Sequence, residues 1–458
     1  MSSYATLMLG SLELGTSRNG VDPELIWLFR PSDKHVEKAT RRNRARLARY
    51  IIPEYIDEFD DANPFTCVEY RCTVADLRDR LELKGFTLEL AKARFNQAGL
   101  QYEEAQVLET ASHSETYPQK LRPLTIEKWL DAIARIKGEC LTEETLASIS
   151  ANDEQLPLLK DMLQFSNRDT YGFPGLGYAY GLPILNYLLF IRLVIESSRP
   201  NEYLVYDLTD LVHAGYVDEE DDCVTLAEVE TNSSIAFHQK VIVLTEGRTD
   251  KDFLERSVKI LYPHLADYFH FFDFNLNKPP GGVGALANLV RAFAAASVEH
   301  RILALFDNDA AARDALKNLD PKSLPENIRF CHYPNLAMAE NYPTIGPSGR
   351  SSMNVNGLAG SLELYLGQDV LENDDGELTP VQWTGYQRRV YSYQGEVLDK
   401  KRIQDRFANK LRVCEMDRGK IDSYDWDGIR SILDVMRVAF HRLDAQLIHS
   451  EVQKVQNF

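Results

Sequence analysis

A regular alternation of short apolar runs and longer amphipathic stretches between residues 241 and 333 constrains the fold of this chain more than any other feature. The apolar runs are rich in β-branched and aromatic residues and predict strands, whereas the stretches between them have helical periodicity. The predicted strands cover residues 241–247, 268–274, 302–309 and 328–333, and the predicted helices end near Leu261 or cover 284–296 and 310–319. Strands that alternate with helices of this length form right-handed βαβ units. We therefore expect an α/β domain over residues 239–445, with a Rossmann-like parallel sheet covered by helices on both faces.

Three carboxylates directly follow two of these predicted strands. Glu246 ends the first strand, and Asp307 and Asp309 end the third. Ligand sites of open parallel sheets lie beyond the carboxyl ends of the strands, so these side chains are expected to converge. Their mutual repulsion is relieved by a divalent cation, and Mg²⁺ prefers such oxygen ligands. The sequence thus predicts a site for Mg²⁺ or Mn²⁺ at this edge.

The two motifs together resemble a known family. The segment VIVLTEGRTDKDFL, followed about sixty residues later by LALFDNDAA, resembles the Toprim signature of topoisomerases, primases and OLD-type nucleases. The Glu-Gly and the Asp-x-Asp match in order and in strand context, over about two hundred residues. The resemblance implies that Asp307 and Asp309 are metal ligands and that Glu246 is a ligand or general base.

The OLD-like branch of that family fits better than the topoisomerase branch. Asp250 lies four residues after Glu246, and GSLELYL (Gly360 to Leu366) resembles the late Glu motif, with Glu363 as the ligand. These two residues would complete a second ion site, which implies two-metal hydrolysis. Lys400 or Lys401 would neutralise developing phosphorane charge. The sequence does not choose between them, and Lys401 joins Glu246, Asp307 and Asp309 in our predicted catalytic set.

Structural alternatives remain for the outer members of this set. Asp250 falls in the first turn of a predicted helix, where the macrodipole favours acidic residues without any ligand role. In the alternative interpretation, Glu363 is a solvated helix residue, and the two lysines are surface charges. Two loops are further candidates: Pro279 to Leu286 for backbone approach to a phosphate, and Asn341 to Asn356, with Arg350, as a substrate-facing loop.

The first half of the chain has a different pattern. Residues 3–14 alternate like a strand or hairpin, Asn19 suits a turn, and residues 36–109 have a helical pattern with Thr73 as an N-cap. We expect a mainly helical domain with a short β-hairpin over residues 1–215. A linker or hairpin over 216–238 and a tail over 446–458 complete the expected domain organisation.

The opening segment MSSYATLMLGSLELGTSRNGVDPELIWLF, paired with a downstream Toprim-like domain, resembles HEPN/Toprim-associated proteins found among bacterial antiviral defence genes. HEPN ribonucleases carry Arg, four to six residues, then His on a helix. The spacing occurs from Arg30 to His35, where Pro31 departs from the pattern, and from Arg442 to His449, outside the expected domain. We predict no separate HEPN active site.

Composition limits how nucleic acid would be bound. The net charge of -18 opposes non-specific association with phosphates, so contact depends on metal ions or on a local patch such as the arginines between Arg41 and Arg49, which suit a solvated helix equally well. Six scattered cysteines without a CxxC pair are typical of reduced thiols. No signal peptide or membrane-length apolar run is evident, so we expect a cytoplasmic protein.

These observations predict a Mg²⁺-dependent nuclease that acts on DNA or RNA as an effector in antiphage defence. The stretch Gly10 to Thr16 lacks the lysine of a P-loop, so control would come from the N-terminal domain or from a separate ATPase or sensor protein. Homo-oligomerisation is an open alternative. The competing hypothesis is a non-catalytic sensor or scaffold that binds metal or nucleotide. A topoisomerase or primase fragment is disfavoured, because no second catalytic tyrosine domain or zinc ribbon is evident.

Overall fold

The computed structural model describes residues 2–38, 66–96, 125–164, 177–180, 182–184, 186–230, 240–273, 281–298, 300–373 and 375–441. These residues belong to two compact units, the first within Met1–Phe237 and the second within His238–Leu443.

An antiparallel sheet lies at the centre of the first unit, with strand order β2-β1-β7-β4-β3. Its strands are β1 (Tyr4–Leu9), β2 (Leu12–Arg18), β3 (Lys34–Lys38), β4 (Thr66–Thr73) and β7 (Tyr203–Asp207). Alternate residues of β1, namely Ala5, Leu7 and Leu9, are fully buried. Because successive strand side chains point to opposite faces, this alternation turns one face of β1 toward the core.

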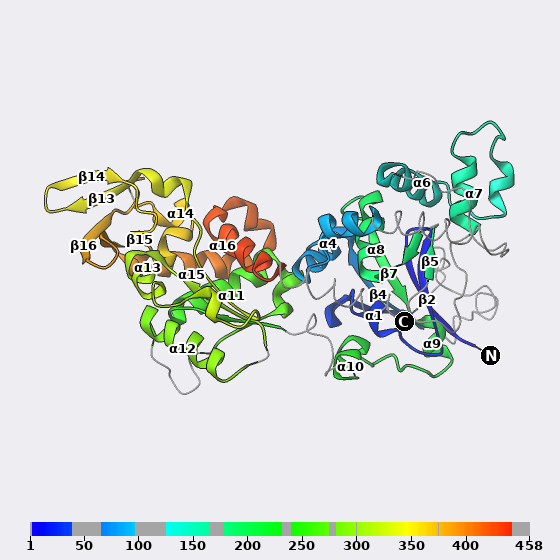
Figure 1. Ribbon diagram of the computed structural model, residues 1–458, viewed down its shortest axis with the longest axis horizontal. Coiled ribbons are helices and arrows are strands. Elements are labelled where there is room, and N and C mark those ends of the chain that lie inside the picture. Colours follow the sequence, from blue (N-terminus) through cyan, green and yellow to red (C-terminus); the bar gives the residue numbers. More distant parts are fainter. Residues whose placement is uncertain are drawn as a thin grey trace. The chain divides into compact units, whose positions relative to one another are not determined.

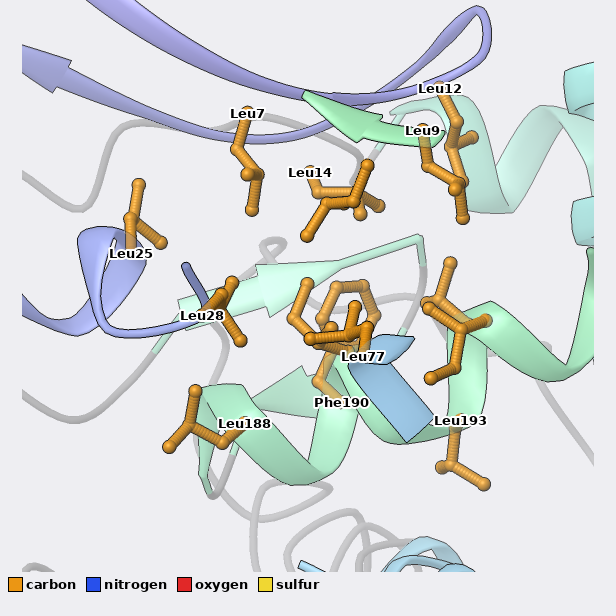
Figure 2. Close-up of a cluster of buried hydrophobic side chains, with 14 of the residues drawn as sticks. Leu7, Leu9, Leu12, Leu14, Leu25, Leu28, Leu77, Leu188, Phe190 and Leu193 are labelled. Carbon is orange, nitrogen blue, oxygen red and sulfur yellow. The ribbon is translucent and has the colours of Figure 1, made fainter. Parts of the chain in front are cut away.

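Helices supply the other side of that core. Leucines of β1 and β2 face Leu188, Phe190 and Leu193 of helix α8 in one apolar cluster (Figure 2). Residues 188–194 of helix α8 are all buried. The helices of this unit include α1 (Pro23–Ile26), α4 (Val74–Leu83), α6 (Ile126–Gly138), α7 (Leu156–Gln164), α8 (Tyr187–Val194), α9 (Thr209–His213) and α10 (Cys223–Glu230). Short additional elements are η1 (Pro31–Asp33), η2 (Thr145–Ser148), η3 (Ile195–Ser197), β5 (Gly177–Ala179) and β6 (Leu182–Ile184).

The predicted helical pattern from residue 36 onward is wrong at β3 and β4, which extend the expected short β-hairpin into a five-stranded sheet. Strand β4 pairs on both sides, and its consecutive residues 67–70 are all buried, so it lacks the alternation that reveals a strand. Thr73 does cap the following helix, since its Oγ1 accepts a hydrogen bond of 3.1 Å from Asp76 N. The expected linker or hairpin over 216–238 contains helix α10, whose Cys223 and Val224 join the first core.

The second unit contains the predicted parallel sheet, with strand order β12-β10-β8-β9 and only parallel pairings. The strands are β8 (Val241–Leu244), β9 (Phe269–Phe271), β10 (Ile302–Phe306) and β12 (Ile328–His332). Helices α11 (Arg248–Leu261), α12 (Val283–Ala295) and α13 (Ala310–Leu316) alternate with them along the chain. Every residue of β10 is buried, as expected for a central strand covered on both faces. The parallel α/β prediction is confirmed here.

A second sheet in this unit has strand order β14-β13-β16-β17, and a short pairing joins β11 to β15. These strands are β11 (Asn308–Asp309), β13 (Tyr342–Gly346), β14 (Gly349–Met353), β15 (Ala359–Gly360), β16 (Val381–Gln387) and β17 (Ser392–Val397). Strands β13 and β14 form an antiparallel hairpin, so most of the expected loop from Asn341 to Asn356 is regular sheet. Strands β13, β14 and β16 lie together at one end of the unit (Figure 1). The remaining elements are η5 (Pro263–Tyr268), η6 (Pro321–Ser323), η7 (Ala337–Asn341), η8 (Leu362–Tyr365), α14 (Gln368–Leu371), α15 (Lys400–Met416), η9 (Arg418–Ser423) and α16 (Asp427–Val438).

No helix among the described residues is both long and apolar enough to cross a membrane. The structure describes all six cysteines, and each is a free thiol.

Candidate metal centre

Glu246 and Asp307 meet at the carboxyl edge of the parallel sheet. Their strands, β8 and β10, are direct neighbours, and each acidic residue lies within two positions of its strand's end. The Asp307 backbone N–H donates a hydrogen bond of 3.0 Å to Glu246 Oε1. The two strand ends are thereby joined, which fixes the Glu246 side chain toward Asp307.

The glycines before helix α12 support the Glu246 backbone. Gly282 N donates a hydrogen bond of 2.7 Å to the Glu246 carbonyl oxygen. Gly282 has a φ of 92°, which residues other than glycine rarely adopt. A Cβ on Gly281 would lie 3.1 Å from the same oxygen. The glycine-rich segment therefore allows close backbone approach, and in this structure it approaches the chain at Glu246.

Asp309 is fixed by two hydrogen bonds. As the N-cap of α13 it accepts a bond of 2.7 Å from Ala312 N at Oδ1, and its Oδ2 accepts one of 2.7 Å from Gln394 Nε2. The preceding Asn308 pairs with Gly360, where a Cβ would lie only 2.5 Å from Asn308 O. Glycine at position 360 thus permits the β11–β15 contact that draws the next segment toward the sheet edge.

That segment carries Glu363, which is buried on η8 with 7% of its surface exposed. Its two carboxylate oxygens accept hydrogen bonds of 2.7 Å from Ser361 Oγ and 2.8 Å from Gln404 Nε2. Lys400 Nζ lies 3.8 Å from Glu363 Oε2. Lys401 is exposed on the same helix. The structure therefore brings Lys400, and not the predicted Lys401, to the carboxylates.

Asp250 lies in the first turn of α11 and also faces the cluster. Burial, together with the charges of Glu363 and Glu246, raises the pKa of Asp250 to about 7, although the charge of Lys400 lowers it. A hydrogen bond from the Gly247 backbone to Asp250 also lowers this pKa. The helix-terminus and cluster interpretations of Asp250 are therefore compatible, because one side chain occupies both environments.

The same electrostatic penalty acts on the other members of the cluster. Burial, followed by the charge of Asp309, raises the pKa of Glu246 to about 7. Burial raises the pKa of Asp307 well above its ordinary value, and the four other predicted carboxylates all add to that rise. The structure thus brings the four other predicted acidic residues within electrostatic range of Asp307, at the carboxyl edge of the parallel sheet.

The arrangement can be tested for its fit to a cation. Asp307 Oδ1 is buried and has no hydrogen-bond partner among the described residues, which is costly for a charged oxygen. A cation would satisfy this oxygen and offset the repulsion. As the side chains stand, however, no three acidic, His or Cys groups in the described parts of the chain are placed to hold a metal ion together. The chemistry of the donors fits Mg²⁺, and side-chain rotation would be needed to complete the coordination.

Three uncharged side chains at this site were missed by sequence reasoning. Gln394 and Gln404 hold cluster carboxylates, and Tyr333 is buried beside them. The pKa of Tyr333 is raised by burial and then by the charges of Asp250, Asp307 and Glu246. Because Tyr333 directly follows strand β12, the rule that drew attention to Glu246 and Asp307 also applies to it. Nothing in the local sequence of the two glutamines signals their contacts.

Other candidates lie elsewhere or beyond the described residues. Arg350 is exposed on β14, 3.6 Å from Glu377. Arg30 precedes η1 and His35 belongs to β3, so this pair is not on one helix. Outside the described residues lie the arginines between 41 and 49, the pair from Arg442 to His449, the tail over 446–458 and the start of the glycine-rich segment.

The fold and site define a two-unit α/β protein with an acidic cluster at the carboxyl edge of a parallel sheet. The family described as HEPN/Toprim N-terminal domain 1 matches residues 1–230, which is half of the chain. The protein belongs to this family, whose name points to a nuclease-related function. No curated protein and no solved structure matches the chain.

Proposed function

We propose that this protein is a metal-dependent nuclease of the Toprim type that hydrolyses phosphodiester bonds of DNA or RNA. The observation that carries the proposal is the convergence of four carboxylates on Asp307, whose own Oδ1 is buried without a hydrogen-bond partner among the described residues. Such a concentration of buried and half-buried acids is unfavourable without a cation. The membership of a HEPN/Toprim family supports the same conclusion.

Mg²⁺ or Mn²⁺ is the proposed cofactor, with two ions. Glu246, Asp307 and Asp309 would hold one ion, and Asp250 with Glu363 would hold the other. Bound ions supply water activation and stabilisation of the leaving oxygen. The donor set supports this assignment, because it consists of carboxylate oxygens from four separate segments of the described chain.

The protein's own groups have complementary roles in this proposal. Glu246, if it does not bind an ion directly, would be the general base that accepts a proton from the attacking water. The ammonium of Lys400 lies on the Glu363 side of the cluster, where it would offset charge that develops on the phosphate. Gln394 and Gln404 would orient the carboxylates that they contact.

The test uses the full chain with single-stranded and duplex DNA and RNA, in Mg²⁺, in Mn²⁺ and in chelator. Glu246→Gln and Asp307→Asn are expected to lower cleavage roughly a hundredfold or more. Asp405→Asn, on the exposed side of α15, is the matched control and should cleave normally. Unchanged cleavage in both site variants would refute the proposal.

We further propose that the nuclease acts as an effector in bacterial antiphage defence and that a separate ATPase or sensor protein controls it. The motivation is the resemblance of the opening segment to HEPN/Toprim-associated proteins found among bacterial antiviral defence genes. In a phage-challenge assay, protection should depend on Asp307, and purification from infected cells should recover a partner. Full protection by Asp307→Asn would contradict an effector role that depends on cleavage.

A non-catalytic sensor that binds metal or nucleotide is the second candidate. It is favoured by the absence, among the described residues, of three side chains placed to hold an ion as they stand. In that case Asp309→Ala would lower the stabilisation by Mg²⁺ but would leave phage protection intact. Loss of both together favours the nuclease.

A further inference from the structure

The hairpin of β16 and β17 has an apolar face that extends beyond the core of the second unit. At its base, Val381 and Val397 are paired and buried. Toward the turn the same face carries Trp383, Tyr386 and Tyr393. A shift in pairing between residues 383 and 385 brings Tyr386 directly opposite Tyr393. The buried side of the hairpin therefore continues as a row of aromatic rings.

These rings are exposed and in mutual contact. The ring centroids of Trp383 and Tyr393 are 5.9 Å apart, and those of Tyr386 and Tyr393 are 5.4 Å apart. Tyr386 is 51% exposed and Tyr393 is 55% exposed. Neighbouring exposed aromatic side chains are typical of binding surfaces, because most such rings are otherwise packed in a core. We call Trp383, Tyr386 and Tyr393 the aromatic row.

Two glycines make room for the first ring of the row. A Cβ on Gly395 would lie 2.9 Å from the Trp383 ring, and one on Gly346 would lie 3.2 Å from it. The indole therefore packs against backbone on neighbouring strands. This packing holds Trp383 in place while leaving it partly exposed.

The turn beyond the row is positively charged. Arg388 and Arg389 are exposed there, and Lys317, which directly follows α13, donates a hydrogen bond to the Arg389 carbonyl. Tyr391 is 83% exposed and has a φ of 51°, an unfavourable conformation for a bulky side chain. Asp314 offsets part of the charge at 3.5 Å from Arg389. Cations beside exposed rings match the chemistry of a nucleic-acid strand, in which phosphates alternate with flat bases.

The opposite side of β17 contacts the acidic cluster. Gln394, the neighbour of Tyr393, donates to Asp309 Oδ2 and accepts a bond of 2.8 Å from Ala311 N. Successive residues of a strand face opposite sides, so one strand carries both an anchor to the cluster and a ring of the row. The aromatic row is therefore held at a fixed distance from the carboxylates.

We propose that the aromatic row binds a single-stranded segment of nucleic acid, with bases stacked on its rings and phosphates at Arg388 and Arg389. This inference rests on the proposed nuclease function and specifies its substrate class. Only unpaired bases offer their faces to protein rings, whereas a duplex keeps them stacked. A second copy of this chain fits less well. It is acidic, with a net charge of -18, but it has no regular series of phosphates to place at the turn.

The test measures binding of a labelled single strand and of its duplex to the full chain in chelator, where no cleavage occurs. The double variant Tyr386→Ala with Tyr393→Ala is expected to bind the single strand roughly tenfold or more weakly. Tyr393→Phe should bind normally because it keeps the ring. The control Tyr216→Ala removes a comparably exposed tyrosine from the first unit and should also bind normally. Arg388→Ala should reduce the slope of log affinity against log salt by about 0.7.

Three outcomes would overturn the proposal: no single-strand binding by the wild type, equal affinity in the double variant, or tighter binding of the duplex. Light scattering tests the alternative, which is self-association through the aromatic row. In that case the mass of the wild type would rise with concentration, and the double variant would abolish this rise without changing strand binding. Strand binding that persists while no metal-dependent cleavage is found would remove the nuclease proposal alone. Cleavage that persists in the double variant, with unchanged affinity, would remove only the aromatic row.

Discussion

Neutralising one carboxylate of the cluster should stabilise the metal-free protein and remove its response to metal. The change that we choose is Glu246→Gln, which keeps the side-chain oxygen that accepts the 3.0 Å hydrogen bond from Asp307 N. It removes one buried negative charge. If the acidic cluster binds a cation, the charge of Glu246 should destabilise the protein in chelator and stabilise it in Mg²⁺.

The size of the effect follows from the pKa of Glu246. Its ordinary value is 4.5, and in the folded chain it is raised to about 7. Between these pH values the folded chain keeps a proton that the unfolded chain has released, so stability falls as the pH rises through this range. By pH 8 the loss attributable to Glu246 is about 3 kcal/mol, and it is absent below pH 4.5. Glu246→Gln should recover most of that loss at pH 8 and nothing at pH 4.

The assay is denaturant unfolding in chelator and in Mg²⁺, at both pH values. In chelator at pH 8 the variant should be the more stable protein. Mg²⁺ at a hundred times its dissociation constant should stabilise the wild type by about 2.7 kcal/mol and the variant by much less. The difference in stability between the two proteins should therefore shrink or change sign.

Asp207 of the first unit provides the matched control. Burial raises its pKa to about 7 as well, and its Oδ1 accepts a hydrogen bond from Thr209 N that asparagine can keep. Asp207→Asn should therefore also gain stability relative to the wild type as the pH rises. Its stabilisation by Mg²⁺ should be the same as that of the wild type. A Glu246→Gln variant that is no more stable than wild type at pH 8 in chelator, or that keeps the full Mg²⁺ response, would refute the reasoning.

Two further changes test other lysine contacts of the second unit. Lys410 is buried and donates to Leu366 O and Asp369 Oδ1, each at 3.0 Å, so Lys410→Met should lower the free energy of unfolding by about 3–5 kcal/mol, measured with denaturant. A loss below about 1 kcal/mol would show that these contacts are dispensable. Lys400→Ala should slow metal-dependent cleavage roughly tenfold, while Lys401→Ala should cleave normally; the reverse order would restore the sequence-based choice.

The central part of the second unit could be predicted because its signals are local. Each strand is a short apolar run, and Glu246 and Asp307 occupy the chain positions that a parallel sheet brings to one edge. The Gly-Gly segment also carried information, since glycine at 282 permits the φ that this approach requires. Such features depend on residues within a few positions of one another.

The rest depends on contacts between distant segments, which sequence patterns do not encode. Strand β4 is hidden by burial on both faces, and it pairs with β7 from well over a hundred positions further along. The choice of Lys400 over Lys401 is set by the direction in which α15 leaves the second sheet. Gln394 reaches Asp309 across 85 positions. In each case the deciding partner lies outside any window that periodicity can examine.

The pairing of β17 separates a turn whose length can change from a base whose register cannot. Insertions or exchanges near Arg388 and Tyr391 lengthen or reshape the turn but leave Gln394 attached to Asp309. A one-residue slip within β17 would instead exchange its two faces, turning Tyr393 toward the carboxylates and Gln394 away from them. The contact of Gln394 with Asp309 therefore fixes the register at the base of this hairpin but does not depend on the length of its turn.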